Sequence, residues 1–122
     1  MGSIGRVIVD HVYYWTRDMD RALVFYTEVV GLGLLRRDGD EWAELDGGPV
    51  RLALHGTDLA EPPASGTVVL RVDDLDETRW ALESRGAIFD DYVGEVEGFA
   101  RFATFRDPDN NPVQIIEYAG EH

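Results

Sequence analysis

The sequence predicts an α+β fold in which two βαβββ modules form a curved mixed sheet with the shape of a cup. Three observations support this prediction. The order of one strand, one helix and three strands occurs twice, the two helices begin with similar residues, and a stretch rich in proline separates the halves at residues 60–66. We therefore expect an N-terminal module over residues 1–60 and a C-terminal module over residues 61–122, which together make one domain.

The first module is expected to begin with a strand over residues 7–16 and to continue with a helix over residues 18–30. Asp18 is suited to the N-cap of this helix and Gly31 to its end. The apolar residues of the helix are spaced by three or four, at Met19, Leu23, Tyr26 and Val30. Three short strands are then expected over residues 34–38, 41–45 and 50–55.

The second module repeats this order. Asp74-Leu75-Asp76 resembles Asp18-Met19-Asp20 at a distance of about 55 residues, which is the length of one supersecondary unit. Its helix is expected over residues 74–85, with Gly86 as the stop. The expected strands of this module cover residues 67–72, 88–92, 99–106 and 112–118.

Composition excludes several classes of partner. The chain has 24 acidic and 11 basic residues, and its formal net charge of -13 disfavours nucleic acid and anionic lipid. A neutral or cationic small molecule is the expected partner. The sequence has no cysteine, so any metal would need histidine, carboxylate or amide ligands. No apolar run approaches the roughly 20 residues of a membrane span, and no secretory pattern is present, so we expect a cytoplasmic protein.

Alternation along the strands predicts a face rich in aromatic side chains. His11, Tyr13 and Trp15 share one face of the first strand, because successive side chains point to opposite sides. Aromatic walls with a few polar groups are typical of small-molecule pockets. The candidate ligand-binding residues are Tyr13, Trp15, Trp42, Arg71 and Tyr118. The alternative is that these rings fill the cup or form a dimer contact.

Glu44 is the candidate catalytic residue. It is expected to face the cavity with Trp42, since Ala43 and Leu45 would face the helix. A carboxylate among aromatic rings could act as a general base or could hold the cation of a ligand. Glu117 has the opposite phase to Gln114 and is expected on the helix-facing side or the rim.

Four motifs resemble the vicinal-oxygen-chelate superfamily, which includes glyoxalase I, bleomycin-resistance proteins and extradiol dioxygenases. The motifs are His11 in the first strand, the helix sequence of residues 18–26, Gly31-Leu32-Gly33, and Asp107-Pro108-Asp109-Asn110-Asn111. The last is similar to the family's Asp-Pro-Asp-Gly-Asn turn, with Asn110 in place of glycine, a residue that also enters left-handed conformations. The resemblance covers nearly the whole chain and implies the βαβββ fold.

The resemblance also implies four metal-ligand positions, which are His11, Ala53, Thr67 and Gln114 in this chain. Ala53 has no donor atom and Thr67 is a poor one, so this set departs from that of a metalloenzyme. His55 shares the strand face of Ala53 and could replace the missing donor. The candidate metal set is therefore His11, His55 and Gln114, which would hold Fe, Mn, Ni or Zn. The alternative is that both histidines only make local hydrogen bonds.

The sequence leaves enzyme status open. One hypothesis is metal-assisted lyase, isomerase or dioxygenase chemistry on a small molecule bound in the cup. A second is a metal-free protein of the resistance type that sequesters an antibiotic or another aromatic compound. A third is a cofactor-free enzyme that uses Glu44 or His11 as an acid or base in the same cavity. The resemblance implies a homodimer as well, with the modules paired either within one chain or between two chains.

Overall fold

The protein consists of two four-stranded mixed sheets, each with a helix on one side. The computed structural model describes residues 5, 10–62 and 66–120. The first sheet has the order β1-β4-β3-β2, with bounds β1 (His11–Thr16), β2 (Gly33–Asp38), β3 (Trp42–Asp46) and β4 (Arg51–Gly56). The second has the order β5-β8-β7-β6, with bounds β5 (Val68–Arg71), β6 (Phe89–Val96), β7 (Ala100–Arg106) and β8 (Pro112–Tyr118).

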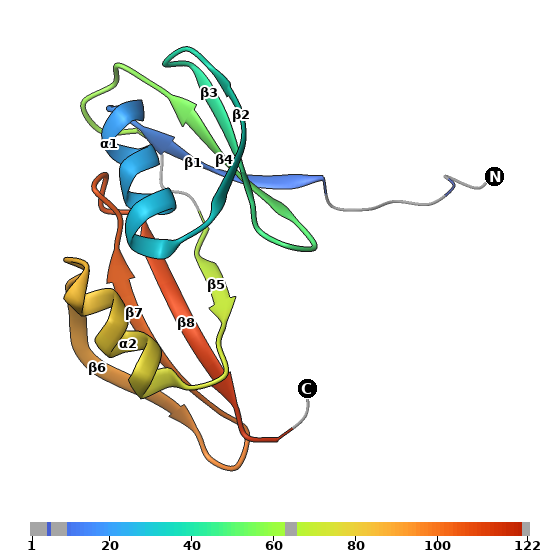
Figure 1. Cartoon of the computed structure of the whole chain (residues 1–122), viewed down its shortest axis with the longest axis vertical. Coiled ribbons are helices and arrows are strands. Elements are labelled where there is room, and N and C mark those ends of the chain that lie inside the picture. The colour runs from blue at the N-terminus through green and yellow to red at the C-terminus, as the bar shows by residue number, and fades with distance from the viewer. Residues whose placement is uncertain (1–4, 6–9, 63–65, 121–122) are drawn as a thin grey trace.

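The two modules have the same topology. In each, the first strand pairs in parallel with the last, while the other pairings are antiparallel. The helices α1 (Met19–Val24) and α2 (Leu75–Ser84) lie on the same side of the molecule, and the two sheets follow one another along its long axis (Figure 1). The predicted fold class of two βαβββ modules is confirmed. Residues 7–9 of the predicted first strand lie outside the described residues.

The first helix has the predicted Asp18 cap, and the second helix begins with an equivalent cap at Asp74. The Asp18 carboxylate accepts a hydrogen bond from Arg21 N at 3.1 Å, and the Asp74 carboxylate accepts one from Glu77 N at 3.0 Å. These bonds satisfy backbone donors that have no partner inside the helix. Gly31 follows the first helix with φ 95°, a left-handed conformation that glycine adopts without strain.

The first helix differs from the prediction in its second half. After α1 the chain continues as a π-helix, η1 (Phe25–Val30), and Gly31 N donates to the Tyr26 carbonyl five residues earlier at 3.0 Å. The spacing of apolar residues predicted a regular helix over both parts. Over so few turns, an apolar stripe does not distinguish a π-helix from an α-helix.

A single hydrophobic core joins the modules on the helix side of both sheets. Tyr14, Leu45 and Leu54 of the first module and Phe105 and Ile115 of the second are buried in the same cluster. The Phe25 ring contacts the Phe105 ring at a centroid distance of 6.0 Å. Burial of these large side chains stabilises the two modules as one unit. No helix of the described residues is both long and apolar enough to cross a membrane.

The turn of residues 107–111 connects the modules with buried and partly buried polar contacts. Tyr26 Oη donates to Asp107 Oδ2 at 2.7 Å, although 81 residues separate them. Thr16 Oγ1 donates to Asp109 Oδ2 at 2.6 Å, and Asn111 Nδ2 donates to the Trp15 carbonyl at 3.1 Å. Burial raises the pKa of the Asp107 carboxyl above its usual value. The motif therefore links the second module to the first strand and first helix.

Candidate functional site

Five rings gather on the open face of the first sheet, opposite the helix. We call this surface the aromatic face, and it consists of His11, Tyr13 and Trp15 of β1, Trp42 of β3 and His55 of β4. Tyr14 and Thr16, which alternate with these residues, are buried on the helix side. Tyr13 keeps 43% of its surface exposed, so a ligand can reach the face.

The rings contact one another in geometries typical of aromatic clusters. Trp42 meets the His11 ring at 5.3 Å and 85° and the His55 ring at 5.6 Å and 84°. His55 lies nearest to Trp15, at a centroid distance of 4.3 Å, and Tyr13 meets Trp15 edge to face at 5.6 Å. Edge-to-face contacts of this kind fix the relative orientation of neighbouring rings. The face is therefore held in one arrangement by its own side chains.

Ala53 lies at the base of the aromatic face. It is opposite Tyr13 on one neighbouring strand and opposite Glu44 on the other, and none of its surface is exposed. A small side chain at this position leaves room for the larger rings around it. The position that the resemblance implies for a metal ligand is thus a covered methyl group.

Glu44 does not have the free carboxylate of a general base. Its Oε1 accepts a hydrogen bond from Arg51 Nη1 at 3.1 Å, and its Oε2 accepts one from Trp42 Nε1 at 3.2 Å. Its side chain is 13% exposed. An ion pair compensates the carboxylate charge, and the indole bond orients the Trp42 ring. This geometry agrees with the predicted inward position of Glu44. It gives no support to the predicted catalytic role of Glu44.

Each histidine of the face uses its Nδ1 atom in a local hydrogen bond. His11 Nδ1 lies 2.8 Å from Asp10 Oδ2, and His55 Nδ1 lies 3.0 Å from the Gly56 carbonyl oxygen. These contacts agree with the alternative in which the histidines make local bonds.

A cleft of about 380 Å³ adjoins the aromatic face, between β1 and β5. Tyr13 and Arg51 line it together with apolar residues such as Val12, Val50 and Val69. A neighbouring cavity of about 700 Å³ includes Arg71 and Tyr118, and the two share the lining residues Leu32, Gly47, Val69 and Leu70. The apolar lining suits a hydrophobic ligand that extends beyond the aromatic face.

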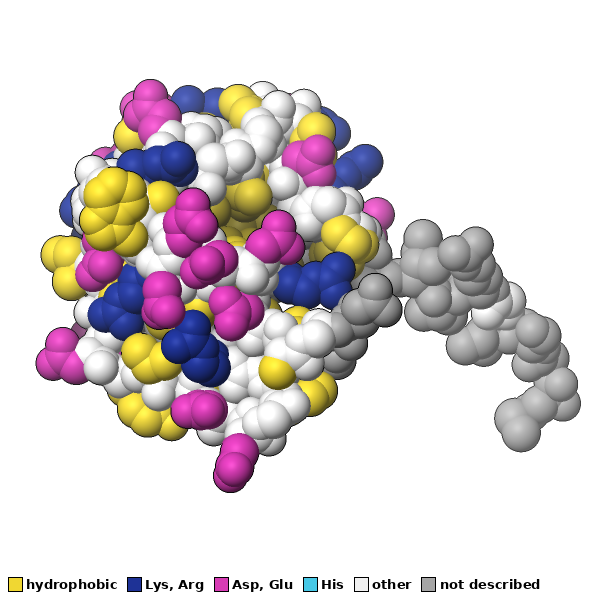
Figure 2. All heavy atoms as spheres, turned by 60° about the horizontal axis from the view of Figure 1, so that its bottom comes forward, with side chains coloured by type: hydrophobic (Ala, Val, Ile, Leu, Met, Phe, Trp, Pro, Cys, Tyr) yellow, Lys and Arg dark blue, Asp and Glu magenta, His cyan; other side chains and the backbone are white. Residues whose placement is uncertain are grey.

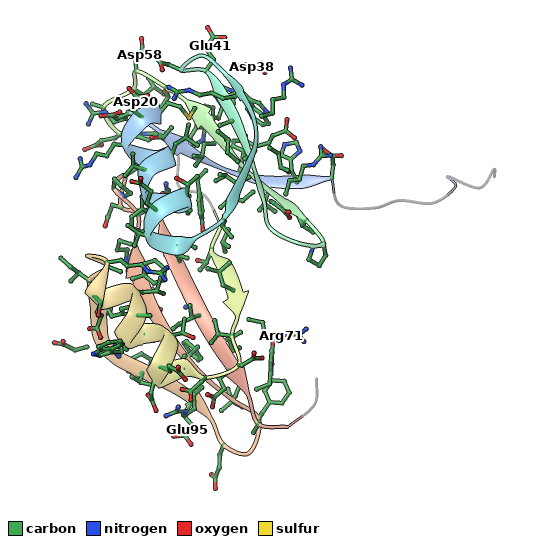
Figure 3. All side chains as sticks on the ribbon, viewed as in Figure 1. Asp20, Asp38, Glu41, Asp58, Arg71 and Glu95 are labelled. Carbon is green, nitrogen blue, oxygen red and sulfur yellow. The ribbon has the colours of Figure 1, made fainter. Side chains whose placement is uncertain are left out.

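The predicted ligand-binding residues therefore form two groups. Tyr13, Trp15 and Trp42 belong to the aromatic face, whereas Arg71 and Tyr118 line the neighbouring cavity along the second sheet. Figure 3 shows Arg71 on the second module, well below the strands of the first. Residues near the junction of the sheets connect the two groups.

The candidate metal ligands do not converge in the chain. Gln114 lies on the second sheet, where its Nε2 donates to Thr104 Oγ1 at 3.1 Å. His11 is opposite Arg51 and His55 is opposite Trp15, so the backbones of the two histidines are about 13 Å apart along the strands at 3.3 Å per residue, and the Trp42 ring lies in contact with both imidazoles. Metal-bound nitrogen atoms lie about 2 Å from the ion. No group of three His, Cys, Asp or Glu side chains in the described parts of the chain could hold a metal ion. Within one chain, these residues do not form a metal centre.

Two residues with clear structural roles were missed or misread in the sequence. Arg51, which neutralises Glu44, has the same strand phase as Ala53 and His55, and that phase was the signal that could have identified it. Glu117 lies on the helix side as predicted, but its carboxylate accepts a hydrogen bond from Leu75 N at 2.8 Å and so caps α2. That contact spans 42 residues and has no local sequence signal.

Acidic side chains dominate the rest of the surface without forming a defined site. A cavity of about 570 Å³ at the start of α1 is lined by Asp18, Asp20, Asp40, Glu41 and Asp58. Figure 3 shows Asp20, Glu41 and Asp58 near one another at the end of the first module. Arg37 donates to Asp20 and Asp40 at 2.7 and 2.9 Å, which compensates part of the charge. On the face shown in Figure 2, acidic side chains are mixed with basic and hydrophobic ones.

Comparison with known proteins places this geometry in a family. Residues 8–115 match the family model described as Glyoxalase/Bleomycin resistance protein/Dioxygenase superfamily. A probable lactoylglutathione lyase from Vibrio cholerae is 26% identical over 129 aligned residues, which cover 92% of this chain and 91% of the relative. A lactoylglutathione lyase from Haemophilus influenzae is 28% identical, with 88% of this chain and 90% of the relative covered.

Two solved structures show the same fold. An antibiotic binding protein from Streptomyces sp. CB03234 is 28% identical and superposes with a TM-score of 0.79, covering 95% of this chain and 99% of that protein. A glyoxalase/bleomycin resistance protein/dioxygenase from Nocardioides is 21% identical with a TM-score of 0.78, covering 98% and 89% respectively.

Proposed function

The chain belongs to the glyoxalase/bleomycin resistance protein/dioxygenase superfamily, and we propose that within it the protein is a metal-free binding protein that holds planar aromatic small molecules against the aromatic face. The observation that supports this proposal most directly is the set of rings packed around Ala53. The position implied for a metal ligand is a buried methyl group, and the surface above it consists of indole, phenol and imidazole rings. Such a surface favours stacking on flat ligands.

The electrostatics of the face support neutral ligands at least as well as cations. The net charge of the chain suggested a neutral or cationic ligand, and Arg51 compensates the carboxylate of Glu44 next to the rings. A cation would still gain from the faces of Trp15 and Trp42. Both kinds of ligand therefore belong in the binding experiments.

The similarity to the Streptomyces antibiotic binding protein supports a binding function. That protein is covered over 99% of its length, so the similarity extends to both sheets. Sequestration requires only affinity and an accessible surface, and the adjoining cleft of about 380 Å³ offers further apolar contact area.

Metal-assisted lyase chemistry is the second candidate. It is favoured by the lactoylglutathione lyases among the relatives and by His11, which occupies one of the implied ligand positions. In members with a metal, the ion would polarise oxygen atoms of the substrate. The separation of Gln114 from the two histidines within one chain argues against this candidate, and no step of the proposed function depends on a metal.

We also propose that the protein forms a homodimer in which a second copy approaches the open faces of the sheets. Tyr13 and Val69 are large hydrophobic residues on these faces that remain exposed in the single chain. Exposed apolar groups of this kind favour association. Sedimentation velocity measurements should give a dimer mass, and a monomer mass at the concentrations of the binding experiments would contradict this part of the proposal.

The binding proposal is tested by titration and by metal analysis on the same preparation. We expect a neutral and a cationic planar compound, 2-methoxynaphthalene and proflavine, to quench the fluorescence of Trp15 and Trp42, with affinities unchanged by a chelator. After growth with added Fe, Mn, Ni or Zn, the metal content should be below about 0.1 equivalent, because a real site would be stoichiometric. One equivalent of metal together with metal-dependent lyase activity would favour the second candidate.

A further inference from the structure

We infer that the ligand of the aromatic face has a hydrogen-bond donor on the rim of its planar ring system, and that His55 Nε2 accepts this hydrogen bond. The inference rests on the proposed function, because it names the chemical class of the molecule bound at the same surface. It assigns to His55 the role of a specificity-determining residue.

The hydrogen bond of His55 determines which of its nitrogen atoms is the acceptor. Nδ1 lies 3.0 Å from the carbonyl oxygen of Gly56. A carbonyl oxygen can only accept, so Nδ1 carries the proton and donates. In the neutral imidazole the other nitrogen, Nε2, then has a free lone pair and acts as an acceptor.

The surroundings of His55 place this acceptor among aromatic rings. Trp15, Trp42 and Tyr13 have ring centroids at 4.3, 5.6 and 5.9 Å from the imidazole. Nε2 is at the end of the imidazole that is remote from the backbone, and so it lies on the side of the rings and away from the strand. A flat molecule that stacks on this face has its rim within reach of Nε2.

The neighbouring polar groups leave the acceptor available. The indole Nε1 of Trp42 already donates to Glu44 at 3.2 Å. Within the described part of the chain, no buried side-chain nitrogen or oxygen is without a hydrogen-bond partner, and the only bond of the His55 ring there is that of Nδ1. Nε2 is therefore accessible from solvent. A ligand donor would replace water at a site whose walls are apolar, where such a bond discriminates well between related ligands.

His11 supplies a matched comparison on the same face. Its Nδ1 contacts Asp10 Oδ2 at 2.8 Å, so its Nε2 is likewise an acceptor in the neutral ring. However, its ring contacts are Tyr13 and Trp42 at 6.3 and 5.3 Å, and Asp10 is exposed. His55 has one more aromatic neighbour and a closer one. We therefore assign the donor of the ligand to His55.

Two pairs of probes that differ only in their donor test this inference. The first pair is 2-naphthol and 2-methoxynaphthalene, and the second is carbazole, with a ring N–H, and dibenzofuran, with a ring oxygen. Dissociation constants are measured by equilibrium dialysis at pH 8. We expect the donor-bearing compound of at least one pair to bind about fivefold more tightly, the ratio expected for one net hydrogen bond. The pair that shows the preference identifies the donor as O–H or N–H.

Variants locate the acceptor. His55→Phe keeps an aromatic ring without an acceptor, and it should reduce the ratio of the two dissociation constants in each pair to about one. His11→Phe, the matched control, should leave the ratio at about fivefold, and so should Trp80→Phe on the exposed side of α2. Thermal unfolding checks that each variant is folded, and His55→Leu replaces His55→Phe if the latter is not.

The possible results separate the inference from the proposed function. A ratio of one for both pairs in the unmodified protein, or a preference that survives in His55→Phe, would overturn the inference while the binding function stands. If no planar compound binds to the unmodified protein, the proposed function fails and the inference fails with it.

Discussion

The two sheets share strand order and helix placement, yet their open faces have different compositions. The first sheet carries five interacting rings around a covered Ala53. On the second sheet, Gln114 bonds to Thr104, and the Phe102 ring lies against Gly94, where a side chain would collide with it. The comparison shows that a duplicated scaffold can keep its core and caps while the solvent-facing positions diverge, because alternate residues of a strand face different environments.

The modules also differ in the contacts of the turn that precedes the last strand of each. The turn of residues 107–111 precedes β8 and binds to the first module, through Asp107 to Tyr26 and through Asp109 to Thr16. The turn before β4 also joins two antiparallel strands, but its Gly48 N–H donates locally, to Asp46 Oδ1 at 2.9 Å. The turn before the last strand therefore contributes to the polar connection between the modules in the second half of the chain and not in the first.

The largest expected effect concerns this connection. Asp107→Ala would leave the Tyr26 hydroxyl and the backbone N–H groups of Asp109 and Asn111 without their buried acceptor. We expect a loss of about 3 kcal/mol in the free energy of unfolding, measured by urea denaturation. Asp90→Ala, at an exposed ion pair on the second sheet, should cost less than about 1 kcal/mol. If the two variants lose equal stability, the contacts of Asp107 stabilise the protein no more than an exposed ion pair does.

Ligand affinity should distinguish the two open faces. Trp42→Ala removes a ring that contacts both His11 and His55, and we expect at least about a tenfold weaker affinity for planar compounds. Phe102→Ala removes a ring of the second sheet and should leave affinity within about twofold. Fluorescence titration of both variants measures this difference. A larger effect of Phe102→Ala would move the ligand site to the second sheet.

The helix caps should behave alike in both modules. Asp18→Ala and Asp74→Ala each remove the acceptor of one backbone N–H at a helix start. We expect each to lower the free energy of unfolding by about 1 kcal/mol, measured by denaturation in urea. If the two losses in the free energy of unfolding differ by more than about 1 kcal/mol, the two caps do not contribute equally to stability.

The smallest expected effect is a difference in pH dependence. Burial raises the pKa of Asp107 in the folded protein above its unfolded value, so proton binding favours the folded state. This contribution is complete below the unfolded pKa and is lost as the pH rises through the folded pKa. Asp107→Asn does not titrate, so the stability difference between the unmodified protein and this variant should shrink as the pH rises from about 4, the unfolded pKa, through the higher folded pKa. A difference that grows over this range, measured by urea unfolding, would contradict the direction of the shift.

Much of the candidate site could be predicted from strand alternation. The phase of β1 placed His11, Tyr13 and Trp15 on one side, and burial of Tyr14 and Thr16 on the other side agrees with this. The phase of β3 likewise placed Trp42 and Glu44 together. The role of Glu44 could not be predicted, since it depends on the ion pair with Arg51 of the neighbouring strand, which requires the register between the strands.

The sequence by itself determined the duplicated βαβββ order, the Asp18 cap of the first helix and the face on which each strand residue lies. These features depend on neighbours within a few residues along the chain, where spacing fixes direction. Tertiary structure alone decided that Tyr26 meets Asp107, that Glu117 caps α2, and that Gln114 stays apart from the two histidines. Those contacts depend on how the two sheets pack over their common core. Packing between distant segments produces no periodic pattern in the sequence.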